Sequence, residues 1–145
     1  MRLSTRGRYG VRLMLDLALH SGNGPVLLKD ISKRQGISQK YLWNLINPLK
    51  TAGIVKSLRG AHGGFTLAKP PSEVSIVDIL RVREGPLCLV DCVDNPSGCE
   101  RAGGCVARDV WCLTCNTIRQ TLETITLAKM MDMHRNKGTS LEYDI

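Results

Sequence analysis

The chain has 145 residues, of which 43% are apolar and 23% charged, a composition that is typical of a soluble globular protein. It holds no run of eighteen apolar residues, and no apolar segment follows its basic N-terminus, so we expect a cytoplasmic protein without a membrane span or an export signal. Charge divides the sequence: residues 1–70 carry 12 basic and 2 acidic side chains, whereas residues 71–145 carry 8 basic and 11 acidic ones and all six cysteines. A solvated basic surface would explain the first half, but the division favours a polyanion-binding module joined to a metal-binding or sensing module.

Three helices are expected in the first fifty residues. Residues 4–20 predict the first helix, because apolar residues recur there at helical spacing, while Asp16 and three arginines fall elsewhere around it. A short second helix is expected over residues 27–35, ended by Gly36. Ser38 is a favoured N-cap for the third helix, in which a proline at position 48 predicts a kink or an end near residue 47.

A β-hairpin and a fourth helix follow. Two apolar runs at 54–58 and 65–68 flank a glycine-rich turn, which predicts two short antiparallel strands. Ser75, with Asp78 three residues later, predicts the capped start of a helix that continues to Arg83.

The rest of the sequence predicts a loop, a long helix and a tail. Residues 84–107 combine glycines, prolines and four cysteines and are expected to be irregular. Residues 108–134 predict one helix, and residues 135–145 predict a flexible polar tail. Apolar residues of this helix recur at alternating steps of four and three, which predicts packing against a partner helix. They are Trp111, Cys115, Ile118, Leu122 and Ile125.

This order of elements is that of a winged helix-turn-helix, so the expected fold is mainly α with a small β-hairpin, and residues 1–83 form a DNA-binding domain. The third helix would enter the major groove, the hairpin would form the wing, and N-terminal arginines would contact phosphates. Similar helix pairs occur in proteins that bind no DNA, but the basic charge of this half favours DNA. The residues expected at the DNA are Ser38, Gln39, Lys40, Tyr41, Trp43 or Asn44, Arg59, His62, Gly63, Gly64, Arg2, Arg6 and Arg8.

The cysteines suggest a site for a soft metal. Cys92, Cys99 and Cys105 are separated by six and five residues in the expected loop, and thiolates suit iron–sulfur clusters, zinc or copper(I). Tetrahedral zinc sites use tighter pairs, which only Cys88 with Cys92 and Cys112 with Cys115 provide. From the residues alone, a cluster and a zinc site are equally well supported. Cys115 lies on the apolar stripe and is expected to be a core residue.

Three stretches of the sequence resemble the IscR, NsrR and CymR family of bacterial regulators, the Rrf-two family. They are MRLSTRGRYG at the start, LKDISKRQGISQKYL in the helix-turn-helix and PLKTAGIVKSLRGAHGGF at the wing. The resemblance extends from Met1 to about Met130. It implies a homodimer that binds partly palindromic, double-stranded operator DNA through residues 1–83 and dimerises through the helix at 108–134. It also implies that the loop at 84–107 holds a 2Fe–2S or 4Fe–4S cluster, with Cys92, Cys99 and Cys105 as ligands.

The sequence departs from the family pattern at two kinds of position. Family members place a histidine three residues after the third cysteine, or an acidic residue in the first helix of the partner subunit, as the fourth cluster ligand. Arg108 and Arg8 stand at these positions here, so the fourth ligand stays open, with Cys112 as the preferred candidate. An acidic residue of the recognition helix is replaced by Trp43, whose indole cannot accept a hydrogen bond from cytosine as a carboxylate does.

These features lead to competing functional hypotheses. The first is a transcription factor that senses cluster status, redox stress or nitric oxide. The second is a regulator of the same fold without a cluster, which responds to a partner protein or to thiol oxidation, or is stabilised by zinc. An electron carrier is the third, but it would need no operator-reading helix. We expect no enzyme, because the sequence shows no catalytic triad, phosphate-binding glycine loop or paired catalytic carboxylates.

Overall fold

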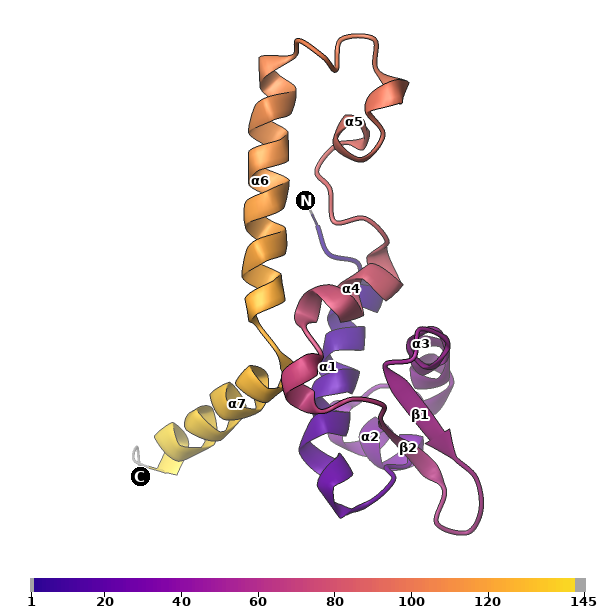
Figure 1. The fold of residues 1–145 in the computed structure, drawn as a ribbon. Coiled ribbons are helices and arrows are strands. Elements are labelled where there is room, and N and C mark those ends of the chain that lie inside the picture. Colours follow the sequence, from indigo (N-terminus) through magenta and orange to yellow (C-terminus); the bar gives the residue numbers. More distant parts are fainter. Residues whose placement is uncertain (1, 143–145) are drawn as a thin grey trace.

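The computed structural model describes residues 2–142 and consists of helices with one two-stranded antiparallel hairpin, as the sequence predicts. In Figure 1, α1 to α4 and the hairpin form the body, α6 rises from it as a long arm, α5 lies at the far end of this arm, and α7 leaves at its base. Within residues 2–142, none of the helices combines the length and apolar character needed to span a bilayer. The elements are α1 (Thr5–His20), α2 (Leu28–Gln35), α3 (Gln39–Thr51), β1 (Val55–Leu58), β2 (Gly64–Leu67), α4 (Ile76–Glu84), α5 (Asp91–Asp94), α6 (Val106–Thr124) and α7 (Leu127–Glu142), with short turns η1 (Ser21–Asn23), η2 (Pro71–Glu73) and η3 (Pro96–Gly98).

Serine caps start the helices of the body. The side chains of Ser4 and Ser38 accept hydrogen bonds from the backbone N–H groups three residues later, at the starts of α1 and α3. Ser75 and Asp78 form a reciprocal capping box at the start of α4, as predicted. The apolar faces of these helices then meet in one core, which contains Leu13, Met14, Leu17, Leu42, Leu45, Ile46, Leu49, Ile79 and Leu80.

Helix α3 is longer than the sequence predicts. We expected a kink or an end at Pro48, yet the helix continues to Thr51. Proline removes one backbone donor, which would have bonded to the carbonyl of Asn44 on the exposed side of the helix, where water can replace it. Leu45 and Leu49 are both fully buried on the opposite side, so core packing holds the helix through the proline.

The prediction of a single helix over residues 108–134 is wrong, because α6 and α7 are separate helices. The chain is extended at Ile125 and Thr126, where it pairs with the strand-like segment before α4. The N–H of Ile76 donates to the carbonyl of Ile125 at 2.8 Å, and the N–H of Leu127 donates to that of Val74 at 2.9 Å. These bonds replace the helical ones that a continuous helix would make. The expected tail is helical as far as Glu142, and residues 143–145 lie outside the described residues.

The apolar stripe predicted to meet a partner helix lies partly against its own chain, and Trp111 in the same stripe is 40% exposed. Cys115 is fully buried, and Leu122 and Ile125 pack against the core. About half a turn away, on the opposite side, α6 exposes a second set of apolar side chains, which we call the α6 stripe. It consists of Val106, Val110 and Leu113, which are 75%, 50% and 69% exposed.

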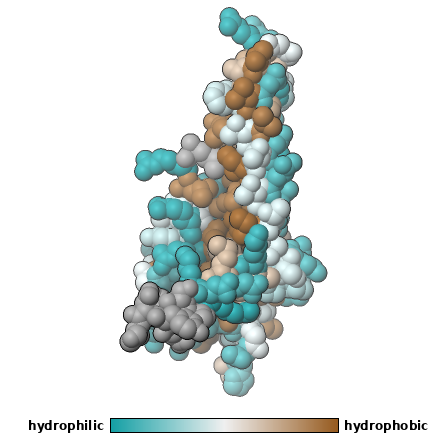
Figure 2. All heavy atoms as spheres, turned by 90° about the vertical axis from the view of Figure 1, so that its left-hand side faces the viewer, coloured by the Kyte–Doolittle hydropathy of each residue, from teal (hydrophilic) through white to brown (hydrophobic). Residues whose placement is uncertain are grey.

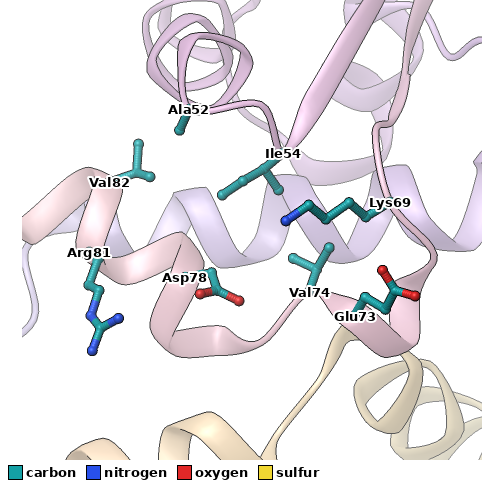
Figure 3. Close-up of a pocket in the computed structure, with 8 residues that line it drawn as sticks. All are labelled: Ala52, Ile54, Lys69, Glu73, Val74, Asp78, Arg81 and Val82. Atoms are coloured by element: carbon teal, nitrogen blue, oxygen red, sulfur yellow. The ribbon is translucent and has the colours of Figure 1, made fainter.

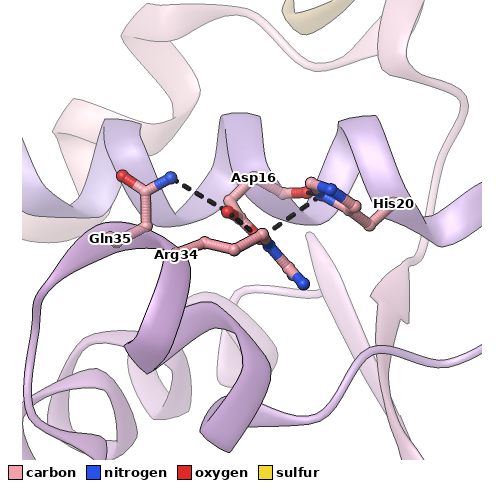
Figure 4. Close-up of polar contacts among 4 residues, drawn as sticks. All are labelled: Asp16, His20, Arg34 and Gln35. Atoms are coloured by element: carbon pink, nitrogen blue, oxygen red, sulfur yellow. Dashed lines mark hydrogen bonds and ion pairs between the residues drawn. The ribbon is translucent and has the colours of Figure 1, made fainter.

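A buried carboxylate fixes α2 against α1. Asp16 is 2% exposed, although the sequence pattern placed it away from the apolar face, and that expectation is wrong. It accepts hydrogen bonds from Arg34 at 2.6 and 3.0 Å and from Gln35 at 2.9 Å, with His20 at 3.5 Å (Figure 4). The bonds to Asp16 raise the pKa of Arg34. Because Gly36 begins the turn to α3 directly after these partners, the network sets the direction in which α3 leaves α2.

Candidate functional site

The first turn of α3 is presented to solvent. Gln39 and Lys40 are exposed beside the Ser38 cap, and Trp43 and Asn44 are exposed one turn later. The sequence-predicted recognition residues therefore lie on an open surface, apart from half-buried Tyr41. Polar and cationic side chains on an exposed helical turn are the groups that reach base edges and phosphates in a groove.

Two aromatic contacts join α3 to the neighbouring parts of this surface. The rings of Tyr41 on α3 and Tyr9 on α1 meet edge to face with centroids 5.9 Å apart. Trp43 meets Phe65 of the wing at 6.0 Å, yet remains 52% exposed. Packing against the wing thus covers part of the Trp43 indole, and its exposed part is free to contact a ligand. A movement of α1 or of the wing would shift α3 through these rings.

A surface hollow of about 390 Å³ lies beside the start of α3. Among the described residues, its lining includes hydroxyl-bearing side chains of both α1 and the start of α3, and no acidic side chain. Hydroxyl groups and helix starts are common donors to backbone phosphates in protein–DNA interfaces. The hydroxyl-bearing residues are Thr5, Tyr9, Ser38 and Tyr41.

The expected arginines and wing residues are exposed, but two glycines have another explanation. Arg2, Arg6 and Arg8 are exposed near the start of α1, and Arg59 and His62 are exposed in the turn of the wing. A Cβ atom on either of the two glycines would press against backbone of this chain: at Gly63 it would lie 2.6 Å from the carbonyl oxygen of Leu58, and at Gly64 2.7 Å from that of Val26. These contacts explain both glycines without DNA.

The cysteine loop does not bring its predicted ligands together. Cys92 lies on α5, Cys99 follows η3 and Cys105 precedes α6, and all three are half-buried. Among residues 2–142 as described, no three side chains of histidine, cysteine, aspartate or glutamate form a group that could hold a metal ion. The thiols have the right chemistry for a cluster, and in this conformation of the loop they do not form a ligand group. Between residues 84 and 107 only Leu87 is buried in the core, so little packing fixes the loop.

Cys88 and Cys115 lie together where the loop meets α6. Cys115 is fully buried, as predicted for a core residue, and its sulfur accepts a hydrogen bond from the N–H of Leu89 at 3.2 Å. The thiol of Cys88 donates to the carboxylate of Asp94 at 2.9 Å. Burial, the bond to Asp94 and the nearby Cys115 raise the pKa of Cys88 to about 12. Cys112, the preferred fourth ligand, is half-buried on α6.

We predict that Cys88 reacts slowly with iodoacetamide at pH 8. A raised thiol pKa leaves Cys88 protonated below the folded-state value, so the reactive thiolate is scarce at neutral pH and becomes abundant only in strong alkali. Alkylation followed by mass spectrometry should be at least about tenfold slower than that of a free peptide thiol. The Asp94→Asn variant removes one cause and should speed the reaction. If Cys88 of the parent protein is alkylated as fast as the peptide thiol, its thiol is not half-buried and hydrogen-bonded as described.

Glu84 is the last residue of α4 and the first of an EGP motif that is part of the resemblance to the family, but the sequence alone predicts no role for it. Its carboxylate accepts hydrogen bonds from the hydroxyl of Ser4 at 2.5 Å and from the N–H of Ser4 at 3.2 Å. Gly7 lies against the same carboxylate, which would collide with a side chain there. A negative charge at the start of α1 is favourable. No local pattern signals this contact across eighty residues, and it joins the start of the cysteine loop to the start of α1.

Arg12 is a second residue that the sequence did not single out. Its guanidinium donates to the side chain and the backbone carbonyl of Gln35, at 3.2 and 2.6 Å, and lies 5.1 Å from the centre of the Tyr9 ring. It therefore fixes the end of α2 through Gln35, the same residue that donates to Asp16 one turn further along α1. The sequence pattern alone predicts that an arginine on the polar face of a helix is solvated. The contacts of Arg12 therefore become evident only in the folded structure.

Comparison with known proteins places the chain in one family. The model of the Rrf2 family, described as an iron-dependent transcriptional regulator, matches residues 3–133. The protein rrf2 of Nitratidesulfovibrio vulgaris is 40% identical over 131 residues, which cover 90% of this chain and 87% of that protein. The structure of CymR, the global cysteine regulator of B. subtilis, is similar with a TM-score of 0.78 and 36% identity, covering 92% of this chain and 98% of that one. IscR of T. potens is similar with a TM-score of 0.76 and 42% identity, covering 92% and 88%. The chain therefore belongs to the Rrf2 family of transcriptional regulators.

Proposed function

We propose that the chain is a homodimeric regulator that binds partly palindromic operator DNA and adjusts this binding to iron–sulfur cluster status, redox stress or nitric oxide. A cluster held by Cys92, Cys99 and Cys105 would be the sensor. The observation that carries the proposal is the position of the cysteine loop, whose first residue, Glu84, is hydrogen-bonded to the start of α1 and whose other end continues into α6.

The exposed basic groups of α1, α3 and the wing support the DNA interface. Residues 1–70 hold most of the positive charge, and the residues expected at the DNA are exposed around the start of α3. Neutralising phosphates releases counterions, so binding should weaken steeply as salt increases.

Replacing Arg59 by alanine should weaken operator binding about tenfold and make the salt dependence less steep by about 0.9 per subunit. The side chain is exposed in the wing turn, so unfolding should be unchanged. The test is a fluorescence anisotropy titration over a range of salt, on a duplex that the parent has selected from a random library. Lys129→Ala, which removes an exposed cation on α7, is the control and should bind like the parent. Equal affinity of Arg59→Ala and parent at every salt concentration contradicts the wing assignment.

The α6 stripe supports the homodimer. Figure 2 shows apolar side chains in a band that runs up this projecting helix. Val106 and Leu113 are more than two-thirds exposed on a helix that stands clear of the body, as seen in Figure 1. A contiguous exposed apolar surface on a helix is typical of an interface, and a second copy of the same helix would cover it.

The cysteine loop supports the sensor by its chemistry and by its weak packing. Three thiols in one segment are suitable ligands for iron, and the matching family is described as iron-dependent. A bound cluster would supply a reactive, releasable centre. The loop must close for its thiols to meet, and binding at the thiols would then order the loop. Ordering of the loop would affect α1 through the hydrogen bond between Glu84, at the start of the loop, and Ser4, at the start of α1.

A regulator without a cluster is the second candidate. It is favoured by the separation of the three thiols and by the similarity to CymR, the global cysteine regulator. In that case oxidation of a thiol, or contact with a partner protein, would change the loop. A zinc site would need Cys88, Cys92, Cys112 and Cys115 together, and Cys88 and Cys115 are already neighbours.

A further inference from the structure

A small hollow lies at the base of the wing, away from the cysteine loop. Its volume is about 250 Å³, and it lies between the end of α3, the residues that flank the hairpin, η2 and α4 (Figure 3). This is below the usual range of about 300–1,000 Å³ for pockets that hold drug-sized ligands, so the hollow suits a smaller molecule. The lining residues are Ala52, Ile54, Lys69, Glu73, Val74, Asp78, Arg81 and Val82.

The floor of the hollow is apolar. Ile54 and Val74 are 8% and 2% exposed, and half-buried Val82 extends the same surface along α4. A floor of this kind can cover a short aliphatic group, but it is too small for an aromatic ligand with substituents.

The walls carry both signs of charge. In Figure 3 the Lys69 side chain extends over Val74, between the carboxylates of Asp78 and Glu73. Among the described residues, Lys69 forms no ion pair with either carboxylate. The Oδ2 atom of Asp78 accepts from both the N–H and the hydroxyl of Ser75, at 2.9 and 2.7 Å, so this carboxylate is held in place. Lys69 and Glu73 are exposed and Asp78 is half-buried, so these opposite charges line the hollow without an ion pair among them. Arg81, the second cation of the lining, pairs with Glu123.

We propose that this hollow binds a small zwitterion, of the class of a free α-amino acid with a short side chain. The ligand carboxylate would lie next to Lys69, its ammonium next to Asp78 and Glu73, and its side chain on Ile54 and Val74. An inorganic anion would face two carboxylates, and a cation would face the ammonium of Lys69, so a molecule with both charges fits best.

Such a ligand would stiffen the base of the wing. At the end of the hairpin opposite its turn, the N–H of Ala68 donates to the carbonyl of Ile54 at 2.9 Å. This hydrogen bond lies directly beside the hollow, which Ile54 helps to line. Arg81 at the rim also reaches Glu123 of α6 at 3.7 Å. A molecule that bridges Lys69 and Asp78 would connect the hairpin to α4. An effect of this connection on operator affinity rests on the DNA-binding function proposed above.

The test is a thermal-unfolding series on the full chain with L-alanine, L-serine and L-valine, confirmed by calorimetric titration. At tenfold excess over the dissociation constant, at least one amino acid should raise the Tm by about 3 °C. Propionate and ethylamine, which each carry one of the two charges, should raise it by less than half as much. Lys69→Met and Glu73→Gln should abolish the shift, whereas Lys56→Met, which removes an exposed lysine on β1, should keep it.

Three results would overturn the proposal: no shift and no heat with any of the three amino acids, equal shifts with propionate, or an unchanged shift in Lys69→Met. Operator affinity measured with and without the amino acid then tests the link to the wing. A change of at least about threefold in the parent but not in Lys69→Met supports it, and unchanged affinity with intact amino-acid binding contradicts it. Failure to bind any duplex while amino-acid binding persists counts against the proposed DNA function and not against this site.

Discussion

Replacing Leu113 by aspartate should convert the protein to a monomer and weaken operator binding by at least about a hundredfold. Leu113 is 69% exposed in the single chain, so a charge there costs the folded monomer little. In the dimer the same charge would be buried against the partner helix without a counter-charge, which is strongly unfavourable. A monomer can occupy only one half of a palindromic operator, so the gain from binding two half-sites at once is lost.

Light scattering and operator titration on the same samples measure both effects. Met133→Asp is the matched control, because Met133 is 52% exposed on α7, outside the α6 stripe, and this variant should remain a dimer. Leu122, which the sequence stripe also suggests, is a poorer probe because it packs against the core of its own chain. A Leu113→Asp protein that is folded and still dimeric contradicts the assignment of the α6 stripe as the interface.

Replacing Asp16 by alanine should lower the free energy of unfolding by about 2–3 kcal/mol. Removing one partner of a fully buried ion pair costs about 3–5 kcal/mol, and the smaller figure applies here because the Arg34 side chain is 34% exposed. The change leaves the donors of Arg34 and Gln35 without their acceptor and frees the end of α2. Operator affinity should fall as well, because the direction of α3 is then less well fixed.

Urea unfolding of the two proteins measures the first effect. Asp132→Ala serves as the control, since the Asp132–Arg135 pair is 64–67% exposed and its loss should change the free energy by less than about 0.5 kcal/mol. If Asp16→Ala costs no more than this control, the buried network does not hold α2 in place.

Local signals in the sequence predict most of the body correctly. Serine caps and apolar periodicity give the starts of α1, α3 and α4, and the glycine-rich turn gives the hairpin, because these features depend on neighbouring residues. The errors involve contacts between distant segments. The end of α6 depends on pairing with the segment before α4, and the burial of Asp16 depends on partners in α2. Periodicity identified an apolar stripe on α6 but not which surface it packs against.

The candidate site shows the same limit. The exposed residues of α3 and the wing follow from position in the motif, whereas Gly63 and Gly64 turn out to accommodate backbone of their own chain. Spacing identified Cys92, Cys99 and Cys105 as one group, but spacing does not establish that three thiols converge in a weakly packed loop. The bond between Glu84 and Ser4 joins residues eighty positions apart, and no pattern in the sequence announces it.

The most direct test of the proposed function is the operator affinity of anaerobically purified protein, measured together with its visible absorption before and after iron chelation. The parent should show the absorption of an iron–sulfur cluster, and chelation should remove this absorption and change the affinity at least about tenfold. Cys92→Ser, Cys99→Ser and Cys105→Ser should each lose both the absorption and the response, Cys88→Ser should keep both, and Cys112→Ser should lose them if Cys112 is the fourth ligand. A colourless parent, or three loop variants that keep the parental absorption and response, would contradict the cluster as the sensor.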